Sequence, residues 1–250
     1  MSYNLTMDEE AFEKALARAQ EDGGGGGIGT LSEKLLHRTL KYYYEPDRTK
    51  HEAEVGGFFA DVLNGEGVTE IQTGSFFHID KKLEAFLKEY PVTLVCPVVR
   101  QRRIVYIDPD SGEVGKPRLS PKKGRVEDLF RELVHIRKRL REENLVISAV
   151  LVDAEEYRVR REPKRKYHDK GYDRAELVPT GLVSETVFVT EDDWLRLLPE
   201  GLDGFTVKEL AEGLRLDRRT AQAMCAALAY AGALTRDESQ RSYIYYRVIK

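Results

Sequence analysis

The spacing of apolar residues predicts alternating helices and strands over residues 28–153. Helical periodicity marks three segments, and short apolar or alternating runs mark the strands between them. In chain order these elements are a helix over 30–44, strands over 51–55, 58–63 and 68–73, a helix over 80–89, strands over 92–99 and 103–107, a helix over 126–141 and a strand over 145–153. Strands separated by helices predict an α/β fold with a mixed sheet.

The pattern changes in character near the end of the chain. Two helices are predicted over 206–214 and 218–231, joined by three residues, and two short strands follow over 234–236 and 243–248. A helix–turn–helix followed by a β-hairpin is the element order of a winged-helix domain. We therefore expect residues 191–250 to form a C-terminal winged helix-turn-helix domain.

The remaining segments are polar. Residues 1–27 hold six acidic and two basic residues, include a short amphipathic segment over 7–19 and end in five consecutive glycines. Such a run predicts a flexible N-terminal segment, so the α/β domain is expected to span 28–160. Residues 161–174 are strongly polar and predict a basic loop. We interpret 161–190 as a basic connector with one or two extra strands over 177–189.

Charge and cysteine content narrow the function classes. The net charge of the chain is −3, yet residues 100–174 hold 21 Lys and Arg against 14 Asp and Glu, which indicates an anionic partner for this region. The two cysteines, Cys96 and Cys225, lie far apart, which is typical of a reducing compartment without structural zinc. No signal pattern opens the chain and no apolar run approaches a membrane span, so we expect a cytoplasmic protein that does not enter membranes.

The candidate chemistry lies in residues 50–73. Asp61 interrupts a run that otherwise suits burial, and a buried carboxylate needs a partner or a metal ion. Glu70 and Gln72 are two apart on the next predicted strand and share one face. We therefore expect Asp61 and Glu70 to bind Mg²⁺ or Mn²⁺, which prefer oxygen ligands. A solvated strand face is the alternative.

These residues, with Glu33 on the first helix and a helix–three-strand–helix layout, resemble the PD-(D/E)XK nuclease superfamily over residues 30–153. The resemblance implies a restriction-endonuclease-like mixed sheet, with Asp61 and Glu70 as metal ligands and Glu33 as a helper carboxylate. It also implies that Gln72 orients the attacking water. Glu33 has an equal alternative role, as the capping-box partner of Thr30.

The chain departs from the superfamily pattern at two positions. Ala60 stands where proline is usual, and Gln72 stands where lysine is usual. Because Gln72 is neutral, the missing positive charge has to come from the metal or from another side chain. Lys81 and Lys82, on the next helix, are candidates for a relocated lysine, and a solvated helix face is the alternative. The five histidines show no metal-binding spacing and receive no catalytic role.

Two basic segments are expected to contact DNA phosphates. Arg118, Lys122 and Lys123 precede the helix at 126, and Arg218 and Arg219 open the second helix of the C-terminal domain. A solubilising loop is the alternative for the first segment, and dimerisation or protein docking is the alternative for the second.

The sequence thus predicts a metal-dependent DNA endonuclease that hydrolyses phosphodiester bonds. One alternative is a catalytically inactive DNA-binding protein that retains the nuclease fold. Another is a winged-helix regulator whose N-terminal domain senses a small molecule. A homodimer is left open.

Overall fold

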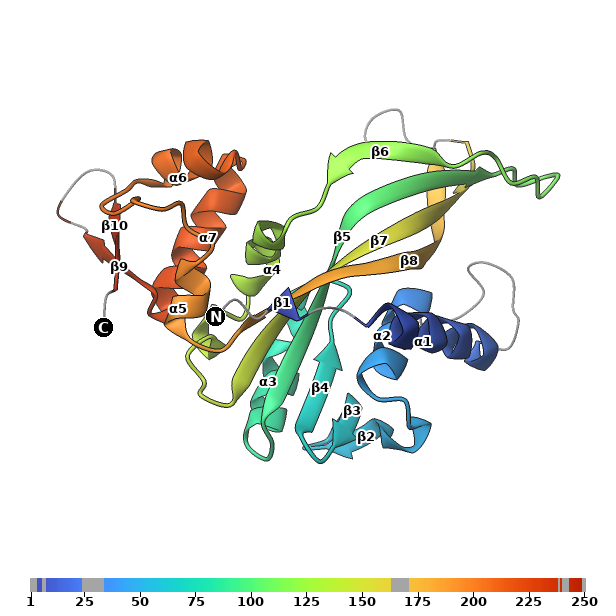
Figure 1. Ribbon diagram of the computed structural model, residues 1–250, viewed down its shortest axis with the longest axis horizontal. Coiled ribbons are helices and arrows are strands. Elements are labelled where there is room, and N and C mark those ends of the chain that lie inside the picture. The colour runs from blue at the N-terminus through green and yellow to red at the C-terminus, as the bar shows by residue number, and fades with distance from the viewer. Residues whose placement is uncertain are drawn as a thin grey trace.

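The computed structural model describes residues 4–5, 8–23, 34–162, 171–237, 239 and 243–248. These residues form an eight-stranded mixed sheet with the order β1-β8-β7-β5-β4-β3-β2, in which β6 pairs with β5 outside that path, and a separate hairpin of β9 and β10 (Figure 1). The strands are β1 (Asn4–Leu5), β2 (His51–Val55), β3 (Phe58–Asn64), β4 (Gly67–Ile71), β5 (Val92–Ile107), β6 (Arg118–Lys123), β7 (Leu145–Arg160), β8 (Tyr172–Phe188), β9 (Leu234–Asp237) and β10 (Ile244–Arg247). The α-helices are α1 (Glu9–Asp22), α2 (Leu35–Tyr44), α3 (Asp80–Leu87), α4 (Phe130–Leu133), α5 (Glu191–Leu195), α6 (Val207–Leu214) and α7 (Arg218–Ala231). Short 3₁₀ turns are η1 (Arg48–Lys50), η2 (Phe76–His78), η3 (Val126–Leu129) and η4 (Arg137–Arg139).

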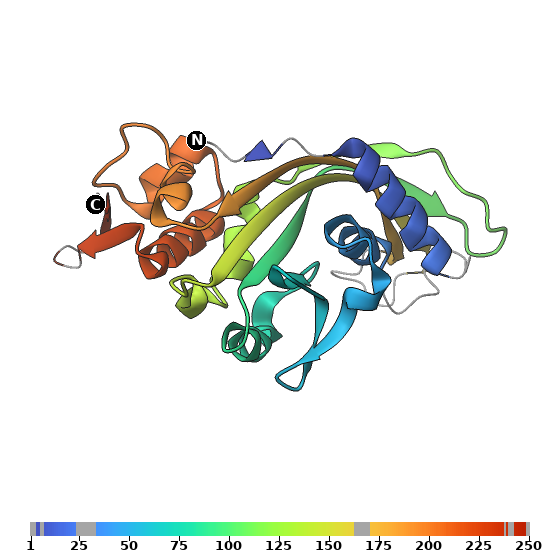
Figure 2. The same cartoon turned by 60° about the horizontal axis from the view of Figure 1, so that its bottom comes forward.

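Helices cover both faces of the sheet. Leu36 and Leu40 of α2 pack on one face against Ile71 of β4 and Val95 of β5. Helices α3 and α4 pack on the opposite face, within the main core. Figure 2 shows that the long strands β5, β7 and β8 curve, and that α2 lies on the concave side of the curve. The predicted α/β class with a mixed sheet is confirmed.

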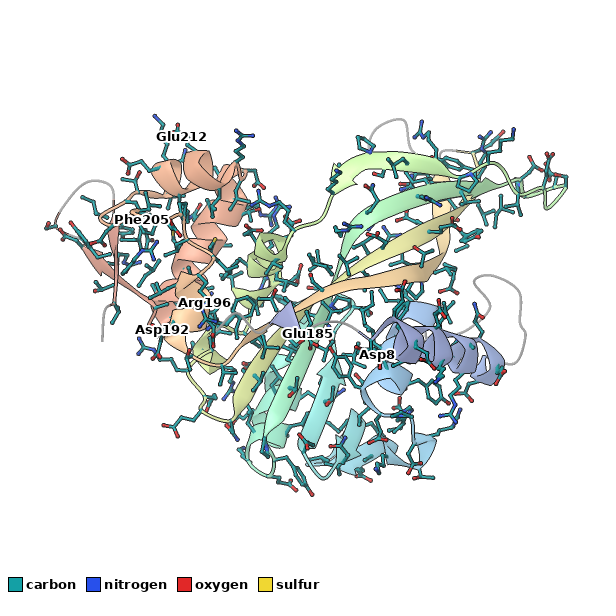
Figure 3. All side chains as sticks on the ribbon, in the orientation of Figure 1. Asp8, Glu185, Asp192, Arg196, Phe205 and Glu212 are labelled. Atoms are coloured by element: carbon teal, nitrogen blue, oxygen red, sulfur yellow. The ribbon has the colours of Figure 1, made fainter. Side chains whose placement is uncertain are left out.

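Helix α2 is also tied to β8 by a polar contact inside the fold. The Tyr44 hydroxyl donates to Glu185 Oε1 over 2.8 Å, and the Ser148 hydroxyl of β7 donates to the same oxygen. Glu185, labelled in Figure 3, is buried. Burial of the phenol raises the pKa of Tyr44 far above its usual range, so this hydroxyl remains a donor at physiological pH.

The N-terminal segment contains a packed helix. Asp8 caps α1 by accepting a hydrogen bond from the Ala11 amide over 2.9 Å. Ala15 and Ala19 of α1 are buried in a cluster with residues of α2. The prediction of a flexible segment over 1–27 is therefore wrong for Glu9–Asp22. The small residues on one side of this helix allow close approach to α2, which composition alone did not reveal.

Strand β5 replaces two predicted strands. Its pairing with β7 shifts register between Val99 and Gln101, so Arg100 forms a bulge within one continuous strand. Asp153 of β7 stabilises the bulge by accepting from the Gln101 amide over 3.1 Å and from Arg100 Nε over 2.9 Å. The polar run at 100–103 therefore bends the strand and does not end it.

Strand β8 corrects the predicted connector over 161–190. Residues 172–188 form one strand that pairs along β7 from Ile147 to Arg160. The loop prediction is wrong for Tyr172–Arg174, and residues 163–170 lie outside the described part of the chain. The polar side chains fit because hydrogen bonds to β7 satisfy the backbone while one face of the strand remains accessible.

The predicted helix over 126–141 is also wrong. The segment is divided into η3, α4 and η4, and α4 has only four residues. Ile136, with φ −110° and ψ 16°, interrupts the helical path and is fully buried. Arg139 beyond it forms ion pairs with Asp80 over 2.9 Å and Glu84 over 2.8 Å of α3. Tertiary contacts thus override the helical periodicity.

The C-terminal helices and hairpin lie where they were predicted, but they do not form an isolated core. One hydrophobic cluster includes Leu94 and Ile147 of the sheet together with Phe205, Leu228 and Tyr245 of the C-terminal segment. Helix α4 lies between them and contacts α7. A boundary at residue 191 therefore cuts through a continuous core.

Gly67 controls the turn that joins β3 to β4, and its replacement is expected to be costly. Gly67 has φ +118°, and a Cβ there would lie 2.4 Å from the carbonyl oxygen of Pro91. We predict that Gly67→Ala lowers the free energy of unfolding by roughly 1–3 kcal/mol, the usual cost of a strained backbone position, as measured by urea denaturation. Gly65→Ala is the matched control, because no atom lies within 4 Å of its added Cβ. Equal losses for the two variants would contradict the argument.

Candidate metal centre

Two buried carboxylates meet where β3 and β4 separate. The last ladder pairs of these strands are Val62 with Thr69, Leu63 with Val68 and Asn64 with Gly67. One step further, the antiparallel register sets Asp61 opposite Glu70. Both side chains are buried. The two acids predicted as metal ligands are therefore brought together by the strand register.

Asp61 accepts hydrogen bonds from both neighbouring elements. Its Oδ2 accepts from the Ile71 amide over 2.7 Å and lies 3.1 Å from His37 Nε2 of α2. Burial alone would raise the pKa of Asp61, but the hydrogen bond and charge of His37 and the Ile71 amide hold it below its usual value, with a further contribution from Lys82. Asp61 is thus the ionised member of the pair.

Glu70 is held by α3 on the other side. Lys82 Nζ donates to Glu70 Oε1 over 2.6 Å, while Glu70 Oε2 is buried and has no hydrogen-bond partner in the part of the chain that the structure describes. Burial and the negative charge of Asp61 raise the pKa of Glu70 to about 7, against the opposing effect of Lys82. A buried carboxylate oxygen without a donor is costly unless a cation or a proton compensates it.

Lys82 was a candidate for the relocated lysine, and the structure places it on Glu70. Its ammonium group also lies 5.5 Å from the centroid of the Phe86 ring, one turn further along α3. Lys81, the other candidate, is exposed. Of the two predicted alternatives, the solvated helix face applies to Lys81 and the contact with the acids to Lys82.

His37 is the contact that sequence reasoning missed. Its only signal was indirect: it lies beside the apolar positions Leu36 and Leu40 of a helix predicted to pack near Asp61. Histidine at such a position is usually part of the core, so the pairing with Asp61 required the fold.

Gln72 and Glu33 are the other two predicted site residues. The Gln72 amide donates to Val95 O over 2.8 Å, and its side-chain Nε2 donates to Ser75 O over 2.8 Å. Its side-chain amide therefore closes the turn toward η2, and the role in orienting water stays a prediction. Glu33 lies outside the described residues.

The donor set suits a hard divalent cation. Among the described residues no group of three or more His, Cys, Asp or Glu side chains is arranged to hold a metal ion. Two carboxylates are nevertheless enough for Mg²⁺ or Mn²⁺ when waters and phosphate oxygens complete the coordination. Glu70 Oε2, which is buried and finds no donor among residues 34–162 or the other described segments, fits such an ion. Asp61 and Glu70 are the residues that would hold it.

The predicted DNA-contacting residues fall at two separate places. Arg118, Lys122 and Lys123 are exposed on β6, which pairs with β5 beyond the end of β4. Arg218 and Arg219 are exposed in the first turn of α7. Arg218 lines a groove of about 1140 Å³ that runs between α6, α7 and the β9–β10 hairpin.

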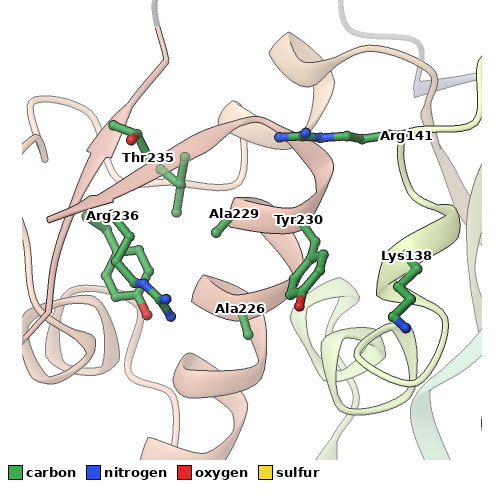
Figure 4. Close-up of a pocket in the computed structure, with 9 residues that line it drawn as sticks. Lys138, Arg141, Ala226, Ala229, Tyr230, Thr235 and Arg236 are labelled. Carbon is green, nitrogen blue, oxygen red and sulfur yellow. The ribbon is translucent and has the colours of Figure 1, made fainter. Parts of the chain in front are cut away.

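A second cavity continues along α7. It has a volume of about 760 Å³ and is lined by Ala226, Ala229 and Tyr230 of α7 and by basic residues that include Lys138 and Arg141. Figure 4 shows these side chains around the cavity. Ala226 and Ala229 are both partly exposed on this side of α7.

The family assignment rests on the segment that contains the two carboxylates. A family model described as "Domain of unknown function (DUF8091)" matches residues 34–189. The chain belongs to this family. The DUF8091 domain runs from the start of α2 to the end of β8, so it includes Asp61, Glu70, His37 and Lys82 and leaves out α1 and the C-terminal helices.

Comparison with other proteins adds one relative. A protein of Treponema pallidum (strain Nichols), described as uncharacterised, is 32% identical over 133 residues, which are 53% of this chain and 53% of the relative. The chain thus spans about half the length of the curated relative it matches. No solved structure shows significant similarity. Within the described residues, no helix is long and apolar enough to span a membrane.

Proposed function

We propose that this protein is a metal-dependent DNA nuclease of the PD-(D/E)XK type, with a restriction-endonuclease-like core and a C-terminal winged helix. The observation that carries the proposal is the opposition of Asp61 to Glu70, one step beyond the last ladder pair of β3 and β4, together with the burial of Glu70 Oε2 without a hydrogen-bond donor among the described residues. The reaction would be hydrolysis of a phosphodiester bond.

The side chains divide the chemistry among them. Asp61 and Glu70 would hold Mg²⁺ or Mn²⁺, which supplies charge stabilisation for the phosphate and lowers the pKa of bound water. Lys82, 2.6 Å from Glu70, provides the positive charge that Gln72 lacks. His37 fixes the orientation of Asp61 through its Nε2 contact. The Gln72 side chain, tied to Ser75, would place its free carbonyl oxygen toward the water.

A second candidate function is a DNA-binding protein that keeps this fold without catalysis. It is favoured by the contacts of the two acids with side chains of the same chain, Asp61 with His37 and Glu70 with Lys82. Such contacts can satisfy the carboxylates without a metal. DNA would then bind through the basic residues of β6 and α7, and a homodimer remains a prediction in either case.

Calorimetric titration with Mn²⁺ distinguishes the two functions. We predict that the wild-type protein binds Mn²⁺ and that Asp61→Asn weakens the affinity by about tenfold or more, because loss of a charged ligand removes part of the coordination. Glu54→Gln is the control, since Glu54 is an exposed acid on β2. Absence of binding in the wild type, or binding that Asp61→Asn leaves unchanged, would favour the non-catalytic protein.

A further inference from the structure

Strands β5, β7 and β8 extend beyond the end of β4 and carry a cluster of arginine and tyrosine side chains. Register pairs Tyr106 with Arg158, Arg158 with Arg174, and Arg160 with Tyr172. Directly paired residues point to the same face of a sheet, and Arg102 shares that face with Tyr106 because the two are four apart on β5. We call this set the Arg–Tyr face; it consists of Arg102, Tyr106, Arg158, Arg160, Tyr172 and Arg174.

The Arg–Tyr face continues the concave side of the sheet that α2 covers. Val152 of β7 packs in the cluster with α2. Arg158 and Arg160 lie six and eight residues further along the same strand, so they point to the same side as Val152. Arg118 of β6 pairs with Ile104, which lies between Arg102 and Tyr106 on this face. One of the basic residues predicted to contact DNA therefore borders it.

A single buried carboxylate organises the arginines. Glu156 is fully buried, and its Oε1 accepts from Arg158 Nε over 2.6 Å. Its Oε2 lies 2.7 Å from Arg102 Nη1 and 3.4 Å from Arg174 Nη2. Three guanidinium groups surround one carboxylate, so the cluster has a net positive charge. This charge favours binding of an anion at the solvent-exposed side of the cluster.

The tyrosines hold guanidinium groups in place. The Arg158 guanidinium lies 4.1 Å from the centroid of the Tyr172 ring, and that of Arg160 lies 5.0 Å from the centroid of Tyr106. The two rings contact each other edge to face at 6.1 Å. Because arginine side chains already cover these ring faces, the two tyrosine rings are not available to stack on nucleic-acid bases. The preorganised arginine forks instead suit phosphate oxygens.

A cavity lies between this face and the start of α2. It has a volume of about 420 Å³ and is lined by Arg102 and Arg174 of the face, by Lys34 and Leu36 at the start of α2, and by Thr73 after β4. Leu36 is the neighbour of His37, and Thr73 is the neighbour of Gln72. Glu176 also lines the cavity, and its Oε1 accepts a hydrogen bond from the Leu35 amide.

We propose that the Arg–Tyr face binds the phosphate backbone of a nucleic-acid strand and directs it along the concave side of the sheet toward α2, whose His37 contacts Asp61. The inference deepens the proposed nuclease function, on which only the destination of the strand depends. Phosphate recognition by arginines already held on tyrosine rings makes the binding independent of base sequence.

The test measures binding of single-stranded DNA without metal. Fluorescence anisotropy in EDTA would compare the wild type with the double variant Arg160→Gln, Arg174→Gln, using two labelled 30-nucleotide strands of different sequence. We expect at least a tenfold loss of affinity for both strands and a fall in the slope of log K against log salt by about 1.4, that is about 0.7 for each lost phosphate contact. The charge-matched control is Arg103→Gln, Arg196→Gln: Arg103 is exposed on the other face of β5, and Arg196 follows α5.

Three results would overturn the inference: wild-type affinity in the double variant, an equal loss in the control, or a strong preference for one sequence. If the double variant does not give the native circular dichroism spectrum, the single variant Arg174→Gln replaces it, because Arg174 is half exposed. The Mn²⁺ titration separates the two proposals. Loss of DNA binding in a protein that binds no Mn²⁺ would refute the nuclease and keep the phosphate-binding face. Normal DNA binding by the arginine variant, in a protein that binds Mn²⁺, would refute the phosphate-binding face and keep the nuclease.

Discussion

Replacement of Asp61 by Asn, or of Glu70 by Gln, is expected to reduce metal-dependent DNA cleavage by roughly a thousand-fold, equivalent to about 4 kcal/mol of transition-state stabilisation. Each change keeps the size of the side chain but removes the negative charge that would hold the cation. The measurement is the rate of cleavage of linear, branched and single-stranded DNA with Mg²⁺ or Mn²⁺. Both acids are buried and directly opposed, so the two losses should be similar.

Controls separate loss of chemistry from loss of fold. The Glu54→Gln variant, which changes an exposed acid of β2, should cleave DNA at the wild-type rate. Each site variant should retain the wild-type circular dichroism spectrum. Cleavage that survives both site changes would assign the activity to another site or to a contaminant. Retarded DNA without cleavage in the wild type would favour the non-catalytic DNA-binding protein.

The backbone around the candidate site was predictable because local patterns determine it. The strands at 51–55 and 58–63 and the helix at 80–89 were located within a few residues, since turns and apolar runs there are short and well separated. The opposition of Asp61 to Glu70 follows from the tight turn at Gly67, which sets the register of the two strands. Sequence reasoning could therefore select these two acids.

The contacts of the acids could not be predicted because they come from distant elements. His37 reaches Asp61 from a separation of 24 residues and Lys82 reaches Glu70 from 12. Helical periodicity predicts which side of a helix is polar, but it does not predict which residues of other elements contact that side. For Lys82 a weak local signal existed, since it lies one turn before the buried Phe86.

The Arg–Tyr face shows a different limit of sequence reasoning. Arg158, Arg160 and Arg174 belong to the excess of basic charge over residues 100–174. Arg158 and Arg160 lie beyond the strand predicted over 145–153, and Arg174 lies in the segment predicted as a basic loop. The anionic partner that composition indicated for this region stays a prediction. The register of β7 with β8 is what gathers the arginines around Glu156.

Replacement of Trp194 by Ala is expected to destabilise the whole chain, because this side chain joins the sheet to the C-terminal helices. Trp194 of α5 is buried, stacks on Phe188 of β8 at 4.1 Å between ring centroids, and contacts Phe130 of α4 at 5.8 Å. We predict a loss of about 3–5 kcal/mol in the free energy of unfolding, typical of a large aromatic removed from a core. Urea denaturation followed by far-ultraviolet circular dichroism is the measurement, since Trp194 is the single tryptophan and its fluorescence disappears with it.

The number of transitions in the unfolding curve also tests whether the sheet and the C-terminal helices share one continuous core. Because residues of the sheet and of α7 belong to one hydrophobic cluster, Trp194→Ala should move a single cooperative transition to lower urea. Trp194→Phe should lose less, since a ring remains to stack on Phe188. Tyr230→Ala removes an aromatic that is 45% exposed on α7 and should have little effect. Two separate transitions in the wild type, or a Trp194→Ala variant in which only the C-terminal helices unfold early, would show that the sheet and the C-terminal segment are stable independently. In that case the C-terminal helices and hairpin could move relative to Asp61 and Glu70, and the proposed contact of α7 with DNA would not fix the DNA in position over the two acids.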